Sequence, residues 1–150
     1  MSSVSSFKHV LIAVDNGERA DKVIRMALRP GLAARATALM VVKDYGVREL
    51  AAATFGPGPG PAHLQERMRS TARRLLDRAL AVSMPPGCAV ARWVSVGDEP
   101  WREIVEFAQR EGCDLIVMAS HGRGELAAAL LGSETAKVLS QSEVPVLVVR

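Results

Sequence analysis

Five short apolar runs, separated by segments of helical periodicity, constrain the fold of this chain more than any other feature. The runs are rich in β-branched and aliphatic residues at consecutive positions, which is typical of strands covered on both faces. Strands that alternate with helices predict a parallel sheet with right-handed crossovers. The runs extend from Phe7 to Val14, Thr37 to Val42, Ala89 to Val96, Asp114 to Ser120 and Val144 to Val149.

The segments between the runs predict helices, because apolar residues recur there at helical spacing. Pro30 and Gly31 predict that the first helix, which starts at Glu18, ends near Arg29. Later helices are expected from Ala62 to about Val82, from Trp101 to Arg110, and within residues 121–141. We therefore predict an α/β fold with a single doubly wound, five-stranded parallel sheet and helices on both faces, of the Rossmann-like type.

Length and composition fit one domain. A chain of 150 residues lies at the usual size of a single domain, so we expect residues 1–150 to form one. Residues 1–6 are serine-rich without an apolar run, and we expect them to be a disordered leader rather than a secretion signal. No apolar run is long enough to cross a bilayer, so we expect no membrane association and a cytoplasmic location.

Charge and cysteine content narrow the classes of function. The net charge of +3 is modest and spread along the chain, so nucleic acid is not an expected partner. The arginines between Arg67 and Arg78 are interleaved with acids and predict a solvated helix face. Cys88 and Cys113 have no CxxC spacing and are interpreted as reduced thiols, and no metal site is predicted.

Several nucleotide and hydrolase motifs are missing. Asp15-Asn16-Gly17 follows the first strand where a dinucleotide-binding domain would have GxGxxG, and no P-loop or GxSxG sequence is present. A phosphate-accepting receiver domain would need a pair of acids after the first strand and an Asp after the third. Gly97 stands where an acid is needed, so that class is also disfavoured.

The loop after the fourth strand is the strongest candidate site. Gly122 and Gly132 flank nine residues, and Ser133 opens the last helix. Glycines let backbone N–H groups approach an anion, and a helix N-terminus adds free N–H groups with a positive dipole. The alternative is a plain turn in which Ser133 only caps the helix, and spacing alone does not decide between the two. Arg123 could neutralise a phosphate, whereas His121 is interpreted as structural or solvated.

The sequence SHGRG, followed by LLGSETAKVLSQSEVPVLVV, resembles the carboxyl third of the universal stress protein family. The resemblance covers nearly the whole chain, including the first strand ending in Asp15, the turn with Gly97 and Pro100, and DLIVM. It implies a five-stranded parallel sheet of the adenine-nucleotide-binding type. The nucleotide-binding branch has the pattern G-x-x-G-x9-G-[ST], which Gly122, Gly132 and Ser133 match, but Ala119 stands in place of the first glycine.

The resemblance also implies roles for residues outside the loop. Asp15 should face the ribose or a phosphate-bound Mg²⁺, and its alternative role is an Asx turn or helix cap. Val41 should face adenine, although a core strand residue is the simpler reading. The expected cofactor-binding residues are Asp15, Val41, Met118, Ala119, Gly122, Arg123, Gly132 and Ser133.

We therefore predict an ATP-binding stress-response or signalling module, with Mg²⁺ as a candidate companion ion. No catalytic residue is assigned, because no acid–base pair accompanies Asp15 and His121, and slow hydrolysis is left open. A homodimer is expected through the strand from Val144 to Val149, which the resemblance puts at the sheet edge. The alternative function is a nucleotide-free dimeric interaction module of the same family, which Ala119 and Gly17 favour.

Overall fold

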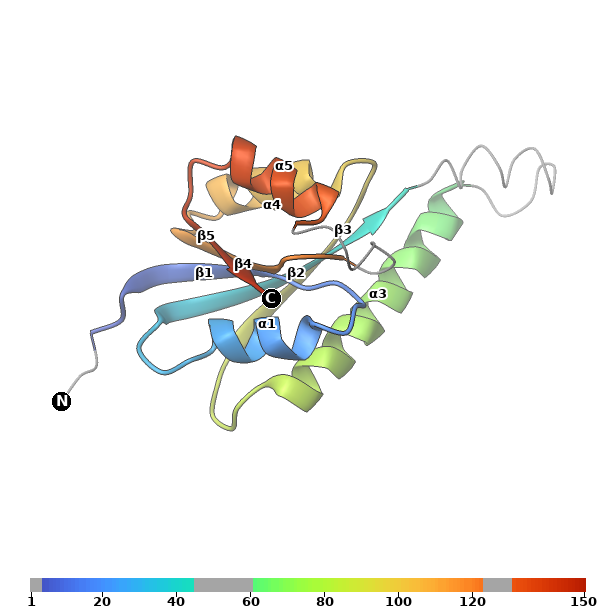
Figure 1. Ribbon diagram of the computed structural model, residues 1–150. Helices are drawn as coiled ribbons and strands as arrows, with labels where there is room; N and C mark the ends of the chain where they lie inside the picture. Colours follow the sequence, from blue (N-terminus) through green and yellow to red (C-terminus); the bar gives the residue numbers. More distant parts are fainter. Residues whose placement is uncertain (1–3, 45–60, 123–130) are drawn as a thin grey trace.

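A computed structural model of the protein describes residues 4–44, 61–122 and 131–150. Its strands form a five-stranded parallel sheet in the order β3-β2-β1-β4-β5 (Figure 1). The predicted fold class is confirmed. The strands are β1 (Phe7–Ala13), β2 (Ala33–Lys43), β3 (Val90–Gly97), β4 (Leu115–Ala119) and β5 (Val146–Val149).

The helices cover the sheet on both faces. In Figure 1, α1 and α3 lie below the sheet, and α4 and α5 lie above it. Because the path changes face between β1 and β4, these two central strands mark the point where ligands bind in open α/β sheets. The described helices are α1 (Ala20–Ala27), α3 (Pro61–Ser83), α4 (Pro100–Arg110) and α5 (Ser133–Gln141).

Strand alternation divides the core into two clusters. Val10 and Ile12 of β1 pack with α1 and α3, whereas Leu11 between them packs with α4. All three side chains are fully buried. The same alternation on β2 sends Met40 to the α1/α3 side, and Leu39 and Val41 to the α4/α5 side.

Several boundaries differ from the sequence prediction. β2 starts at Ala33, before the predicted Thr37, because Phe7 of β1 pairs with Ala33 where the sequence is no longer uniformly apolar. β5 starts at Val146 because Ser142 Oγ accepts the backbone N–H of Val144, which keeps that residue in a turn. The first helix ends early, as predicted, and Gly31 follows it with φ of 80°.

The leader and the longest connection are only partly described. Val4 is exposed, and the backbone N–H of Ser6 donates to Gly31 O. Residues 1–3, most of the connection between β2 and α3, and residues 123–130 with Arg123 lie outside the described residues. Among the described helices, none combines the length and apolar character needed to cross a membrane. Both cysteines are free.

A polar cluster around the buried side chains of His9 and Thr37 lies at the amino-terminal end of the sheet. The guanidinium of Arg35 lies 2.9 Å from His9 Nδ1, and the Nε2 atom of His9 lies 2.8 Å from Thr37 Oγ1. A guanidinium can only donate, so Nδ1 accepts and the Nε2–H donates to Thr37. The Asp114 carboxylate accepts the backbone N–H groups of Lys8 and His9. These bonds connect β1, β2 and the start of β4.

Candidate functional site

A cavity of about 910 Å³ opens at the carboxyl ends of the central strands. This volume lies within the usual range for small-molecule sites. The ends of β1, β2 and β4 form its floor, and the start of α5 and the stretch of α3 from Leu64 to Leu75 form parts of its wall. The cavity therefore occupies the position that the sheet topology predicts for a ligand.

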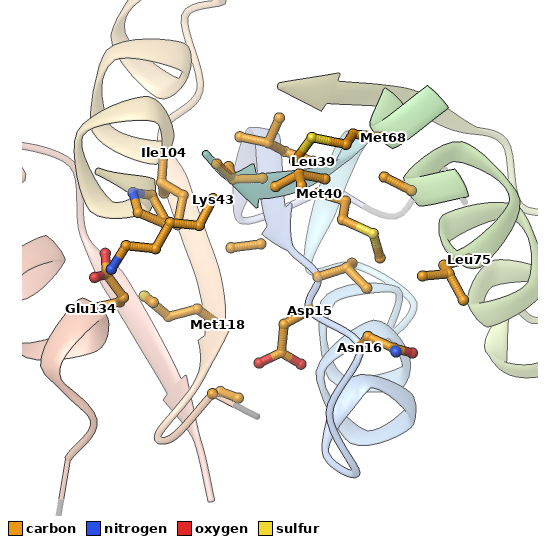
Figure 2. Close-up of a pocket in the computed structure, with 18 of the residues that line it drawn as sticks. Asp15, Asn16, Leu39, Met40, Lys43, Met68, Leu75, Ile104, Met118 and Glu134 are labelled. Atoms are coloured by element: carbon orange, nitrogen blue, oxygen red, sulfur yellow. The ribbon is translucent and has the colours of Figure 1, made fainter. Parts of the chain in front are cut away.

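The cavity has an apolar side along α3 and a side of mixed character along α4 and α5, where Figure 2 shows Ile104 and Met118 near Lys43 and Glu134. Met40, Met68 and Leu75 lie on the side of α3, and Lys43 and Glu134 lie on the opposite side, with Asp15 between them in this view. Val41 and Ile104 also line the cavity, on the α4 side of the sheet. A ligand that fills the cavity must therefore present both an apolar ring or chain and polar groups.

Asp15 follows β1 and is held by a local turn. Its Oδ1 accepts the backbone N–H of Gly17 at 2.8 Å, which is the Asx turn that the sequence left as an alternative role. A Cβ on Gly17 would lie 2.8 Å from that same oxygen, so the turn depends on glycine. The other oxygen, Oδ2, faces Gly122, where a Cβ would lie 3.5 Å away. The carboxylate is thus oriented toward Gly122.

The start of α5 is fixed above the end of β4. Gly132 is the N-cap and Ser133 the first helical residue, so the alternative in which Ser133 caps the helix is not observed. The backbone N–H of Gly132 donates to Ser120 O at 2.6 Å, and Thr135 Oγ1 donates to Ala119 O at 2.8 Å. These bonds aim the N-terminus of α5 at the cavity, where its dipole and first-turn N–H groups can bind an anion.

The N-terminus of α4 is capped by a side chain from α5. Glu99, the N-cap of α4, makes no side-chain cap bond. Instead, the backbone N–H of Trp101 donates to Glu134 Oε2 from α5 at 2.8 Å. The side chain of Glu134 therefore connects the first turns of the two helices.

The structure brings most of the expected residues to one place. Gly132 is buried beside the cavity as the N-cap of α5, and Arg123 lies outside the described residues. The expected residues that line the cavity are Asp15, Val41, Met118, Ala119, Gly122 and Ser133.

Other lining residues were not selected from the sequence. His121 is buried, with Nδ1 lying 3.0 Å from Ser120 Oγ, so of the two roles considered for it, structural or solvated, the structural one fits. Lys43 continues β2 past its apolar run, and Arg67 belongs to the exposed arginines of α3. Met68 is one of the apolar residues that recur at helical spacing in α3, and this spacing alone does not indicate a cavity. Only its place near the carboxyl end of the sheet distinguishes it.

The described residues include no group of three or more His, Cys, Asp or Glu side chains that could hold a metal ion. A cation at this site would thus need oxygen atoms from the ligand as well. Asp15 is suitably placed as a single protein carboxylate, because it lines the cavity beside Gly122.

Comparisons with known proteins agree with this geometry. The sequence model of the universal stress protein family matches residues 6–150. This chain belongs to the universal stress protein family. Full-length relatives include a universal stress protein of Thermus aquaticus, 28% identical with 96% of this chain and 99% of the relative covered. Universal stress protein YxiE of Bacillus subtilis is 29% identical over the same shares of the two chains.

The universal stress protein MJ0577 of Methanocaldococcus jannaschii is related more closely over a shorter segment. It is 51% identical over 51 residues, which cover 34% of this chain and 32% of the relative. The solved structure of MJ0577 superposes with a TM-score of 0.77 at 28% identity, covering 95% of this chain and 94% of that one. The structure of UspA from Lactobacillus plantarum has a TM-score of 0.64 at 24% identity, with 95% and 97% covered, and supports the fold alone. The universal stress protein fold thus extends over nearly the whole chain.

Proposed function

We propose that this universal stress protein binds ATP in the cavity at the carboxyl ends of β1 and β4 and acts as a stress-response or signalling module. The observation that carries the proposal is the convergence of the α5 N-terminus, Gly122 and the Asp15 carboxylate on one cavity. A helix N-terminus and an open glycine backbone suit phosphate oxygens. A carboxylate beside them suits a ribose hydroxyl or a phosphate-bound Mg²⁺.

The proposed base position lies on the α4/α5 side of the sheet. Val41, Met118 and Ile104 present apolar surface there, which suits the faces of an adenine ring. The phosphates would then extend toward Gly122, Gly132 and Ser133, and Arg123 stays a proposed phosphate contact.

Ala119 favours the alternative of a nucleotide-free interaction module. It stands where the motif of the nucleotide-binding branch begins with glycine, and it is buried and lines the cavity. Its methyl group narrows the space beside the phosphate position. Because alanine is the smallest replacement for glycine, we propose that it weakens ATP binding without abolishing it.

A thermal-shift titration with ATP and Mg²⁺ tests the proposal. ATP at a hundredfold excess over its Kd would stabilise the protein by about 2.7 kcal/mol, which raises the Tm of a domain of this size by roughly 5–10 °C. The variant Gly122→Val should lose this shift, because its side chain would stand between Asp15 and the phosphates. Gly122 is exposed and its added Cβ meets Asp15 only at 3.5 Å, so the variant should keep its fold.

The matched control is Ala89→Val, which also adds methyl groups but lies exposed before β3, at the amino-terminal end of the sheet. It should retain the full shift. Absence of any shift in the unmodified protein at millimolar ATP would reject the proposal and favour the nucleotide-free module.

We propose a homodimer through β5, which lies at an edge of the sheet. We assign no catalytic residue, and the proposal leaves slow hydrolysis of ATP open. Two free cysteines fit a reducing compartment, and we propose a cytoplasmic location.

A further inference from the structure

Glu134 lies where two helix N-termini meet. Its Oε2 accepts the Trp101 N–H in the first turn of α4, while its own backbone belongs to the first turn of α5. A carboxylate in this position is favoured by the positive end of the α4 dipole. The side chain is half-buried and lines the cavity, so its charge is less screened than that of a fully exposed acid.

The distance from this carboxylate to a bound phosphate is limited by covalent geometry. The N–H groups in the first turn of α5 belong to Glu134 itself or to adjacent residues. A phosphate that accepts one of these N–H groups therefore lies within about 9 Å of the Glu134 carboxylate. Asp15 lines the same cavity. Two carboxylate residues thus line the cavity. The ligand proposed for it, as free ATP, carries about two more negative charges than its Mg²⁺ complex or AMP.

Cationic side chains also line the cavity. They are Lys43 and Arg67, and Figure 2 shows Lys43 extending toward Glu134. Removing the Glu134 charge would make the cavity more positive whether or not Lys43 compensates part of it. The direction of the effect on an anionic ligand is therefore the same in both cases.

We propose that Glu134 is a specificity-determining residue that makes this site select nucleotides whose phosphate charge is neutralised by a divalent cation over metal-free triphosphates. This inference rests on the proposed nucleotide-binding function and goes beyond it. Occupancy of the site then depends on the supply of the divalent cation as well as of nucleotide.

The test compares Kd values of metal-free ATP, Mg²⁺-ATP and AMP, measured by isothermal titration for the unmodified protein and for Glu134→Gln. Glutamine retains an acceptor for the Trp101 N–H and removes only the charge. We expect the variant to bind metal-free ATP about threefold to tenfold more tightly, with smaller changes for AMP and Mg²⁺-ATP.

The matched control is Glu143→Gln, which removes the same charge from an exposed position beyond the far end of α5. It should leave all three Kd values within about twofold. If both proteins bind nucleotide and Glu134→Gln leaves the ratio of metal-free ATP to AMP affinity unchanged, the inference about Glu134 is wrong while the proposed function stands. If neither protein binds any of the three ligands, the inference about Glu134 and the proposed function are both rejected. Thermal unfolding of each variant checks that the fold is retained.

Discussion

At the scale of single residues, His9 couples the stability of the fold to pH. Burial lowers its pKa below the ordinary value of 6.5, and the nearby Arg35 guanidinium lowers it further. The Glu111 carbonyl and the Asp114 and Glu111 carboxylates oppose this shift. The neutral ring also has the hydrogen bonds that suit it, accepting from Arg35 and donating to Thr37. Protonation would remove the first of these bonds.

The expected result is a loss of stability in mild acid. A folded-state pKa below the unfolded one means that the unfolded chain binds more protons as pH falls below about 6.5, so the free energy of unfolding decreases there. The decrease should level off below the folded pKa. Urea unfolding between about pH 7.5 and about pH 5 measures it. His9→Gln should flatten this part of the profile, and an unchanged slope in that variant would assign the effect to another group.

Gly17 controls the orientation of Asp15. An alanine here would bring its Cβ to 2.8 Å from Asp15 Oδ1, and the carboxylate would have to rotate away from the Gly17 N–H. The φ of Gly17 is not positive, so the effect should come from this contact rather than from the backbone.

We expect Gly17→Ala to cost about 1 kcal/mol of unfolding free energy and to weaken ATP binding. A double-mutant cycle with Asp15→Ala isolates the contact, because Gly17→Ala should cost almost nothing once the carboxylate is absent. Additive effects in the cycle would contradict this account.

At the scale of elements, α3 contributes both to the core and to the wall of the cavity. Leu76 and Leu80 are buried against the sheet, whereas Leu64, Met68 and Leu75 line the cavity and stay partly exposed. Ala72 is buried and also lines the cavity. One helix therefore supports the fold and forms part of the site.

Truncation of a core residue in α3 should cost far more than truncation on its surface. Leu76 is fully buried, so Leu76→Ala should lower the unfolding free energy by about 2–5 kcal/mol. Val82 is 70% exposed on the same helix, and Val82→Ala should change it by less than about 0.5 kcal/mol. Denaturant unfolding measures both, and similar losses in the two variants would contradict the assigned packing.

At the scale of the whole molecule, β5 is an edge strand of the sheet, and we propose that the protein dimerises through it. The backbone N–H of Ile116 donates to Pro145 O, just before β5, and that of Ser120 donates to Val149 O. The carbonyl groups of odd-numbered residues in this stretch therefore face β4. By the alternation of a parallel ladder, the backbone groups of Val148 face outward. Outward N–H and C=O groups invite pairing with a second copy of the chain.

Val148→Pro should dissociate the proposed dimer, since it removes the outward N–H without removing a bond to β4. Sedimentation at micromolar concentration should give a dimer for the unmodified protein and a mass near 16.1 kDa for the variant. Aspartate at Val149 would be a poorer test, because that side chain belongs to the core. A dimer that persists in Val148→Pro would assign the interface elsewhere, and a monomeric unmodified protein would reject it.

The sequence by itself determined the number of strands, their places along the chain and the parallel type of the sheet, because each buried strand must be apolar on both faces whatever surrounds it. The order of the strands within the sheet came from the tertiary structure. The sequence also indicated the candidate site, since Gly122, Gly132 and Ser133 are local to one strand–loop–helix unit. Boundaries such as the start of β2 were missed because pairing with Phe7 extends the strand beyond its apolar run.

Only the tertiary structure decided which distant side chains share the cavity. His121 is buried because of what packs around it, and Lys43, Met68 and Glu134 come together from β2, α3 and α5. The bond from the Trp101 N–H to Glu134 joins residues 33 positions apart, so no local pattern signals it. Helical periodicity places Met68 among the apolar residues of its helix. Apolar residues that face a cavity have the same spacing as those that face the core, so the sequence does not distinguish the two.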